Sequence, residues 1–554
     1  MKILQRNLYP ILLVLFLVWM AIGVFPLYCY ENDSMHVLAG CGIMVNQGIQ
    51  LPPIMSYEYN MQPLTYFVVV IGTKIASFLT VEHVYCLLAW ISAVAFTLGS
   101  LDFVNKVYRP HNKLHLLLAL ALLPEMYAAG MYPNSAIPAA ASFVWALCFI
   151  WNRKYIPGLL LMVIAPLFRV DVVIVYPALL PLFWLRGESF KKSFLFSAAF
   201  ALSIIALLTL CFWLLHANPL ESVVGYQHWN NTIERRDVIL AILGYYSIVY
   251  LILLPLGVGF AVRNQVFKHL FLCLLPICLL HFVYRSMGCA SKHYLYISPF
   301  VILLGTIAIE GISRRSRLVK SVALVALIFV SCFSVARINT QDPSLNYRLP
   351  VRYAFKEIRR GDFKWSFGLG AGQHIPTKDE HMLGTGNLLY PFYIHYFKKE
   401  MVLQMEAQLG YLQAQKGVCT LYAINNYTDD IALPLYLIES GFKVSNITRG
   451  MNMHFGSRES TRDRNRKINK GIRDYYLTKG NRGIHVVIIP EELGGKITPN
   501  ILRRIVIENK QSQSPAYVMA GAYETAALYD EIVEKNPKFK KVATGLYQLV
   551  LDER

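Results

Sequence analysis

The sequence predicts a polytopic α-helical membrane protein, of about eleven spans, that ends in an α/β domain outside the cytoplasm. Of the 554 residues, 55% are hydrophobic and only 16% are charged, which is typical of membrane proteins. The apolar runs all lie before about Ile338, and charged and polar residues dominate beyond it. We therefore expect a transmembrane domain over 1–340 and a soluble domain over 341–554.

The individual spans follow from the apolar runs, because crossing a bilayer takes about 20 apolar residues. The first run, 8–27, follows Lys2 and Arg6, and no small-residue cleavage site comes after it, so we interpret it as a retained helix. Further runs cover approximately 84–104, 113–131, 134–151, 154–168, 171–186, 191–215, 238–262, 267–285, 293–311 and 319–337. The apolar run 63–79 is interpreted as a helix at the interface, within a long first external loop over 28–83.

Every second loop between these spans is short and basic, and this pattern indicates the orientation of the chain in the membrane. Basic residues fill the loops at 106–113, 153–154, 186–192, 263–268 and 314–320. Loops rich in Lys and Arg stay in the cytoplasm, so the N-terminus is predicted inside and the C-terminal domain outside. Much of the net charge of +19 lies in these loops and is therefore explained by membrane orientation. The sequence shows no motif for binding RNA or DNA.

The outer side of the first span carries acidic residues that suit proton transfer. Glu31 and Asp33 follow the span directly, and Glu58 lies further along the same loop. A carboxylate there is well placed to act as a general base on an acceptor that meets a lipid-borne substrate. The alternative is a solvated loop with no chemical role.

Cations and aromatic residues gather at three other outer helix ends. Such clusters suit binding of the phosphate or pyrophosphate of a lipid. We assign this role to Arg169, Arg285, Lys292, His293, Tyr294, Arg235 and Arg236. The alternatives are an Arg169–Asp171 ion pair that locks two helix ends, snorkelling at the interface, and an aromatic belt. Lone histidines, such as His281, are interpreted as structural.

The soluble part alternates strand-like and helical runs, which indicates an α/β layered domain. Predicted strands cover 363–368, 417–424, 443–447, 485–489, 516–519 and 546–551. Predicted helices cover 350–359, 431–440, 499–508 and 524–535. Cys419 is the only cysteine here, so no disulfide within this domain is expected.

These features together resemble the GT-C glycosyltransferases, integral membrane enzymes that use lipid-phosphate sugars, and within them the dolichol-phosphate-mannose-dependent mannosyltransferases. The resemblance covers roughly 1–340. It is carried by Glu31-Asn-Asp33-Ser, the loop Tyr57-Glu-Tyr-Asn-Met-Gln-Pro-Leu64, Tyr132-Pro-Asn134, Phe168-Arg-Val-Asp171, and His281-Phe-Val-Tyr-Arg285 through Lys292-His-Tyr-Leu-Tyr-Ile-Ser-Pro299.

The resemblance implies an inverting single displacement in which an acid of the first external loop activates the acceptor. Asp33 is the best match for that base, with Glu31 and Glu58 in reserve, although Asp33-Ser34 stands where the family has an Asp-Glu pair. We assign contacts with the sugar or the acceptor to Tyr57, Gln62, Asn134, Asp171, His228 and Trp229. The resemblance favours no metal and no other cofactor, without excluding a divalent cation.

The expected function is therefore transfer of a sugar from a polyprenyl phosphate to an extracytoplasmic glycan, lipid or protein, by a mannosyl- or arabinosyl-type enzyme of the cell envelope. Two alternatives remain: a transporter or flippase of lipid-linked sugars, and a ligase that moves a whole glycan from a pyrophosphate lipid. The flippase is disfavoured because no internal repeat is visible. A bacterial plasma membrane is favoured over the endoplasmic reticulum, because the outer domain lacks disulfides.

Overall fold

The computed structural model describes two groups of residues. In the N-terminal part these are 8–18, 37, 41, 44–45, 62–79, 81–123, 126, 134–214, 235–284, 291–314, 321–323 and 325–326. In the C-terminal part they are 407–408, 410–412, 414–415, 419–424, 444–449, 484–489, 499–510, 515–519, 533 and 535–550. The chain forms two compact units: Met1–Glu31, Tyr59–Val68 and Glu82–Tyr396 make the first, and Asn32–Glu58, Val69–Val81 and Phe397–Arg554 the second.

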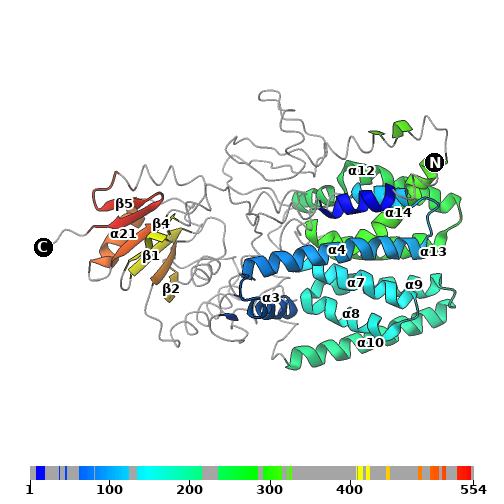
Figure 1. The fold of residues 1–554 in the computed structure, drawn as a ribbon, viewed down its shortest axis with the longest axis horizontal. Coiled ribbons are helices and arrows are strands. Elements are labelled where there is room, and N and C mark those ends of the chain that lie inside the picture. The colour runs from blue at the N-terminus through cyan, green and yellow to red at the C-terminus, as the bar shows by residue number, and fades with distance from the viewer. Residues whose placement is uncertain are drawn as a thin grey trace. The chain divides into compact units, whose positions relative to one another are not determined.

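The first unit is helical (Figure 1). Its helices are α4 (Val81–Val107), α5 (Lys113–Ala121), α7 (Ala136–Trp151), α8 (Tyr155–Phe168), α9 (Leu179–Leu185), α10 (Phe190–Leu214), α12 (Arg235–Arg263), α13 (Phe267–Tyr284) and α14 (Ser298–Ser313), with the 3-10 helices η3 (Val170–Ala178) and η5 (Ser291–Ile297). A further helix, α3 (Pro63–Ile75), occupies most of the predicted interfacial run. Most of these helices follow a predicted apolar run, but α5 ends ten residues before the run 113–131 does, and the run 171–186 is divided between η3 and α9.

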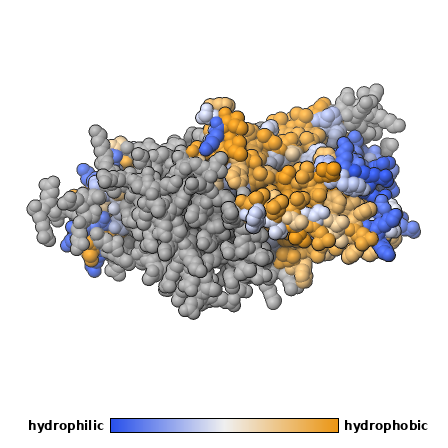
Figure 2. All heavy atoms as spheres, turned by 90° about the horizontal axis from the view of Figure 1, so that it is seen from below, coloured by the Kyte–Doolittle hydropathy of each residue, from blue (hydrophilic) through white to orange (hydrophobic). Residues whose placement is uncertain are grey.

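Four helices in the described part are long and apolar enough to cross a membrane: 83–107, 190–214, 267–284 and 294–313. Several shorter apolar helices accompany them. The surface of this unit in Figure 2 is mostly hydrophobic, with hydrophilic residues at one end. Helix α10 exposes large apolar side chains, among them Leu202, Ile205 and Trp213. These features fit a polytopic membrane protein, and the count of eleven spans stays a prediction.

The basic loops that the structure describes, at 106–113, 153–154, 186–192 and 263–268, gather at one end of this unit, which we call the basic end. Arg186 Nη1 donates to the carbonyl of Ile150 at 2.8 Å, which joins the ends of α9 and α7. Lys268 Nζ donates to the carbonyl of Trp184 at 3.3 Å, which joins α13 to α9. Since these loops meet in space, their common location supports the pattern from which the orientation was predicted. The membrane side of the basic end stays a prediction.

Glu310 of α14 ties the loop after α4 to the basic end. Its carboxylate accepts hydrogen bonds from the backbone N–H of His111 at 2.7 Å and the hydroxyl of Tyr108 at 3.2 Å. Burial, and after it the neighbouring Glu310 carboxylate, raise the pKa of Tyr108. This polar anchor closes one end of the helical core.

Helices α12 and α14 pack closely enough that small residues are required between them. A Cβ at Gly257 would lie 2.5 Å from the carbonyl oxygen of Leu304, and one at Gly305 would lie 2.8 Å from the hydroxyl of Tyr250. Glycine therefore lets the helices approach, as is common in membrane proteins. Tyr250 also donates to the carbonyl of Ala119, which adds α5 to the same contact.

The second unit contains a six-stranded sheet in the order β2-β3-β1-β4-β6-β5. The strands are β1 (Cys419–Ile424), β2 (Val444–Arg449), β3 (Ile484–Ile489), β4 (Ala516–Met519), β5 (Phe539–Ala543) and β6 (Leu546–Leu549). The first four run parallel, with Leu421 of β1 opposite Val486 and Tyr517, and β6 and β5 are antiparallel. Helix α21 (Pro499–Asn509) contributes Leu502 and Ile505 to a core with Val518 and Tyr547.

The predicted strands at 417–424, 443–447, 485–489, 516–519 and 546–551 and the helix at 499–508 coincide with these elements. The strand β5 was not predicted. The predicted strand 363–368, the helices 350–359 and 431–440, and most of 524–535 lie outside the described residues. The boundary at 340/341 and the extracytoplasmic location stay predictions.

Candidate functional site

The candidate site begins at Arg169, where the chain leaves α8 and enters η3. The backbone of Arg169 is extended (φ −162°, ψ 118°), so the residue ends one helix and precedes the next. Its side chain is only 1% exposed. A buried guanidinium needs a partner, because removing a charge from water is costly.

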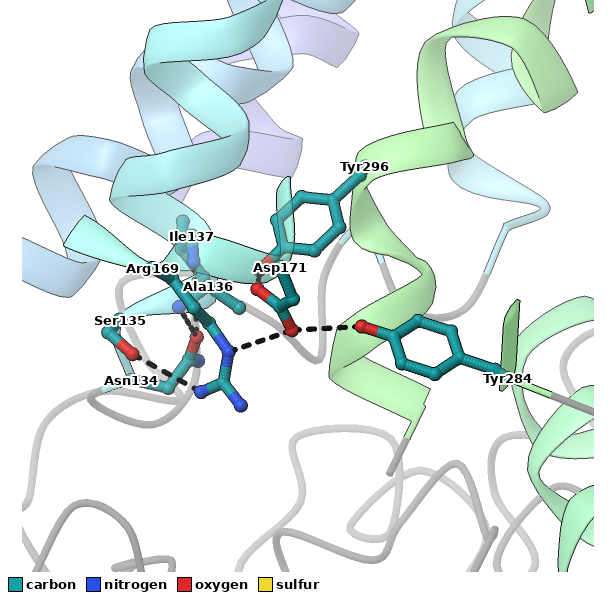
Figure 3. A network of polar contacts seen from close by, with 8 residues as sticks. All are labelled: Asn134, Ser135, Ala136, Ile137, Arg169, Asp171, Tyr284 and Tyr296. Atoms are coloured by element: carbon teal, nitrogen blue, oxygen red, sulfur yellow. Dashed lines mark hydrogen bonds and ion pairs between the residues drawn. The ribbon is translucent and has the colours of Figure 1, made fainter. Parts of the chain in front are cut away.

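Asp171 supplies that partner and joins two further elements to it (Figure 3). Arg169 Nε donates to Asp171 Oδ2 at 3.1 Å. The Tyr284 hydroxyl, at the end of α13, donates to the same oxygen at 2.9 Å. The Tyr296 hydroxyl, in η5, donates to Oδ1 at 2.6 Å. Three separate elements therefore meet at one carboxylate.

The N-terminus of α7 forms the other side of the network. Arg169 Nη1 lies 3.3 Å from Ser135 Oγ, to which it donates. Asn134 Oδ1 accepts from the backbone N–H groups of Ala136 and Ile137 at 3.0 and 3.1 Å, and so caps the helix. The amide oxygen of Asn134 thus has a structural use, because the first N–H groups of a helix lack partners within it.

A cluster of aromatic residues lies beside Tyr284. The ring of Tyr294 packs against those of Tyr284, Tyr245 and His281, with centroids 6.1, 5.4 and 5.1 Å away. The Tyr246 hydroxyl lies 2.7 Å from His281 Nε2. The Tyr245 hydroxyl lies 2.7 Å from Ser298 Oγ. These contacts hold α12, α13, η5 and α14 together, and the structural role of His281 stays a prediction.

This network lies at the helix ends opposite the basic end. Helices α7 and α14 end at the basic end, and the network involves the start of α7 and the η5 segment that leads into α14. An arginine held by fixed partners in a water-poor site is suited to binding phosphate, because its planar fork matches phosphate oxygens. A guanidinium of this kind has the chemistry to stabilise negative charge on an anion that contacts it.

The structure places only some of the predicted site residues. Arg169 and Asp171 form the ion pair that was the alternative to their assigned roles in binding phosphate and the sugar or acceptor, and those roles stay predictions. Tyr294 is buried in the aromatic cluster, and Asn134 caps α7. Gln62 is 3% exposed, ahead of α3, and among the described residues its Oε1 has no hydrogen-bond partner. Outside the described residues lie Glu31, Asp33, Tyr57, Glu58, His228, Trp229 and Arg285. Lys292, His293, Arg235 and Arg236 lie in described helices, but their side chains are outside the description.

Ser135, Tyr284, Tyr296 and Tyr246 were not among the predicted site residues. Tyr284 and Tyr296 are separated from Asp171 by 113 and 125 positions. Both stand within the segments quoted for the GT-C resemblance, one residue before Arg285 and two after Tyr294. Tyr284 directly precedes Arg285 and Tyr296 follows Lys292 by four positions, which was a usable signal because buried tyrosine hydroxyls need partners.

Among the described residues, no three His, Cys, Asp or Glu side chains come together as metal ligands would. The acids of the first external loop are outside that set. The expected independence from metal therefore stays a prediction.

No protein-family model matches the chain, and no curated protein matches it. Among solved structures, the chain is similar to ArnT from Cupriavidus metallidurans bound to undecaprenyl phosphate. The TM-score is 0.60 and the identity 13%, over 97% of this chain and 98% of that one. The chain has the GT-C fold. The apo state of the same ArnT matches with a TM-score of 0.56 and 12% identity, over 97% of each chain. The predicted GT-C resemblance is thus confirmed at the level of fold.

Proposed function

We propose that this protein is a membrane glycosyltransferase that moves a sugar from a polyprenyl-phosphate donor to an extracytoplasmic acceptor. The observation that carries the proposal is the buried Arg169, held by fixed partners at the helix ends opposite the basic end. The fold supports it, because ArnT, which matches this chain over nearly its full length, is bound to undecaprenyl phosphate in its structure.

In this proposal Arg169 binds the phosphate of the donor. As the bond to the sugar breaks, negative charge grows on the phosphate, and a fixed guanidinium stabilises it without having to reorganise. Arg285, Lys292, His293, Arg235 and Arg236 are proposed to add to the same positive field. Tyr294 is proposed to shape the pocket wall.

Asp33 is proposed to be the general base, with Glu31 and Glu58 as alternatives. The carboxylate takes the proton of the acceptor hydroxyl, the acceptor oxygen attacks the anomeric carbon, and the lipid phosphate leaves from the opposite face with the bonding electrons. One such displacement inverts the anomeric centre. Tyr57, Gln62, His228 and Trp229 are proposed to contact the sugar or the acceptor.

The remaining assignments belong to the same proposal. The basic end faces the cytoplasm, so the site and the C-terminal α/β domain face the outside of a bacterial plasma membrane. The reaction needs no divalent cation, so chelation by EDTA should leave the rate unchanged. The C-terminal domain is proposed to take part in choosing the acceptor.

The test is transfer by the purified full-length protein from a panel of polyprenyl-phosphate sugars. We expect a glycosidic product and a loss of at least about 100-fold in kcat for the variant of the true base, since general bases contribute 10²–10⁴-fold. The variants are Asp33→Asn, Glu31→Gln and Glu58→Gln. Glu188→Gln, at the basic end, is the matched control.

Three results would redirect the proposal. Full activity in all three acid variants would remove the base assignment. Movement of a labelled lipid-linked sugar across proteoliposomes without any glycosidic product would favour the flippase. Transfer from pyrophosphate-linked glycans alone would favour the ligase.

A further inference from the structure

Both carboxylate oxygens of Asp171 accept hydrogen bonds from other side chains. Oδ2 accepts from Arg169 Nε and from the Tyr284 hydroxyl, and Oδ1 accepts from the Tyr296 hydroxyl. The three donors come from the α8–η3 junction, the end of α13 and η5 (Figure 3). At least three of the about four acceptor positions of this carboxylate are thus used by fixed donors within the protein.

We propose that Asp171 is a positioning residue, which fixes the guanidinium of Arg169 for the donor phosphate, and that Tyr284 and Tyr296 in turn fix Asp171. This inference rests on the proposed function. It moves Asp171 from the sugar or acceptor contacts, where the sequence placed it, to the support of the phosphate site.

The first argument is the orientation of the guanidinium. Arginine has a long, flexible side chain, and ordering it costs up to about 2 kcal/mol of rotamer entropy. Here Nε is held by Asp171 at 3.1 Å and Nη1 by Ser135 at 3.3 Å. Two anchors on different elements fix the plane of the fork before a ligand arrives. A phosphate then binds without ordering the side chain itself.

The second argument is charge. A bare carboxylate next to Arg169 would repel an incoming phosphate, although it balances the buried guanidinium. The hydroxyls of Tyr284 and Tyr296, at 2.9 and 2.6 Å, direct their positive ends at that carboxylate. Hydrogen bonds to a charged group are stronger than neutral ones, so the two tyrosines reduce the repulsion that the phosphate meets. Both are buried, which strengthens the effect.

The experiment measures binding of a polyprenyl phosphate to the purified full-length protein, with inorganic phosphate as the headgroup-only probe. We expect Asp171→Asn to raise the Kd for polyprenyl phosphate about tenfold, and Tyr284→Phe and Tyr296→Phe each about three- to tenfold. Tyr155→Phe is the matched control, because its hydroxyl accepts from Arg186 at the basic end. That variant should bind like the wild type.

A double-mutant cycle separates positioning from a general structural role. Lysine at 169 keeps the charge but lacks the planar fork. In the Arg169→Lys background, Asp171→Asn should therefore change Kd less than about twofold, whereas independent effects would multiply. In turnover, Asp171→Asn should raise the donor KM with kcat largely kept.

Wild-type affinity for polyprenyl phosphate in Asp171→Asn, or full multiplication in the cycle, would overturn the positioning role while leaving the proposed function intact. A loss of kcat at unchanged KM would make Asp171 catalytic instead. A wild-type protein that does not bind polyprenyl phosphate would refute the proposed function itself. Should Asp171→Asn fail to fold, wild-type affinity in both Tyr→Phe variants would overturn the inference equally.

Discussion

Gly257 and Gly259 of α12 should respond differently to the same substitution. A Cβ at Gly257 would lie 2.5 Å from the carbonyl oxygen and 3.1 Å from the carbonyl carbon of Leu304 on α14, whereas one at Gly259 would meet nothing within 4 Å. The obstacle at Gly257 is backbone, so it cannot rotate away. Gly257→Ala therefore requires α12 and α14 to separate.

The magnitude follows from two opposing terms. Overpacking a tight contact costs about 1–3 kcal/mol, and alanine in place of glycine within a helix gains up to about 1 kcal/mol. Gly259→Ala has only the second term, so it should be neutral or gain up to about 1 kcal/mol. Gly257→Ala has the overpacking cost in addition, so it should be about 1–3 kcal/mol less stable than Gly259→Ala. Since α12 and α14 also carry the Tyr245–Ser298 hydrogen bond of 2.7 Å, the loss of stability should extend to the aromatic cluster beside Tyr284.

The assay is thermal unfolding in one detergent at one scan rate, because unfolding of such a protein need not be reversible. We expect the Tm of Gly257→Ala to lie a few degrees below that of Gly259→Ala, roughly 2–4 °C per kcal/mol or less in a chain of this size, and Gly259→Ala to leave the wild-type Tm equal or higher. Equal Tm values for the two variants would refute the packing argument.

Three further predictions concern the basic end, the α7 cap and the second unit. Glu310→Ala should lower the free energy of unfolding by about 2–3 kcal/mol, because two donors lose a charged acceptor, and Glu310→Gln should lower it less. The measurements are Tm, which should fall, and proteolysis near Tyr108, which should become faster. An unchanged Tm in the alanine variant would contradict this prediction. Asn134→Ala should cost about 0.5–2 kcal/mol through loss of the cap, and Asn134→Asp should not; equal Tm values for both would speak against the cap. Burial raises the pKa of Cys419 to about 11, so only about one Cys419 thiol in a thousand is ionised at pH 8. Iodoacetamide should therefore label Cys419 only in denaturant. Rapid labelling of Cys419 in the native protein would contradict its burial.

Much of the fold could be predicted from the sequence, because its signals are local. Apolar runs of helical length located α4, α10 and α13 within a few residues, and the strand-like run 516–519 coincides with β4. The strand β5 escaped prediction, since Lys540 and Lys541 interrupt a short run whose pattern resembles a loop. It forms only by pairing with β6, at the edge of the sheet.

The candidate site could be predicted only in part. Arg169 and Asp171 stand two positions apart within an apolar stretch, so their burial as a pair was readable from the sequence. The partners of that pair were not. Tyr284 and Tyr296 lie on α13 and η5, and no local pattern states which helix end faces which.

The sequence by itself located the apolar helices to within a few residues at α4, α10 and α13 and showed which loops are basic, because each depends on residues close together along the chain. Only the tertiary structure decided that Ser135, Tyr284 and Tyr296 meet at Arg169 and Asp171, and that Asn134 is used as a cap. Helix packing makes these choices. The approach of α12 to α14 at Gly257 and Gly305 helps to fix the arrangement of the helix ends, and a buried charge is then stable only where donors and acceptors from those ends surround it.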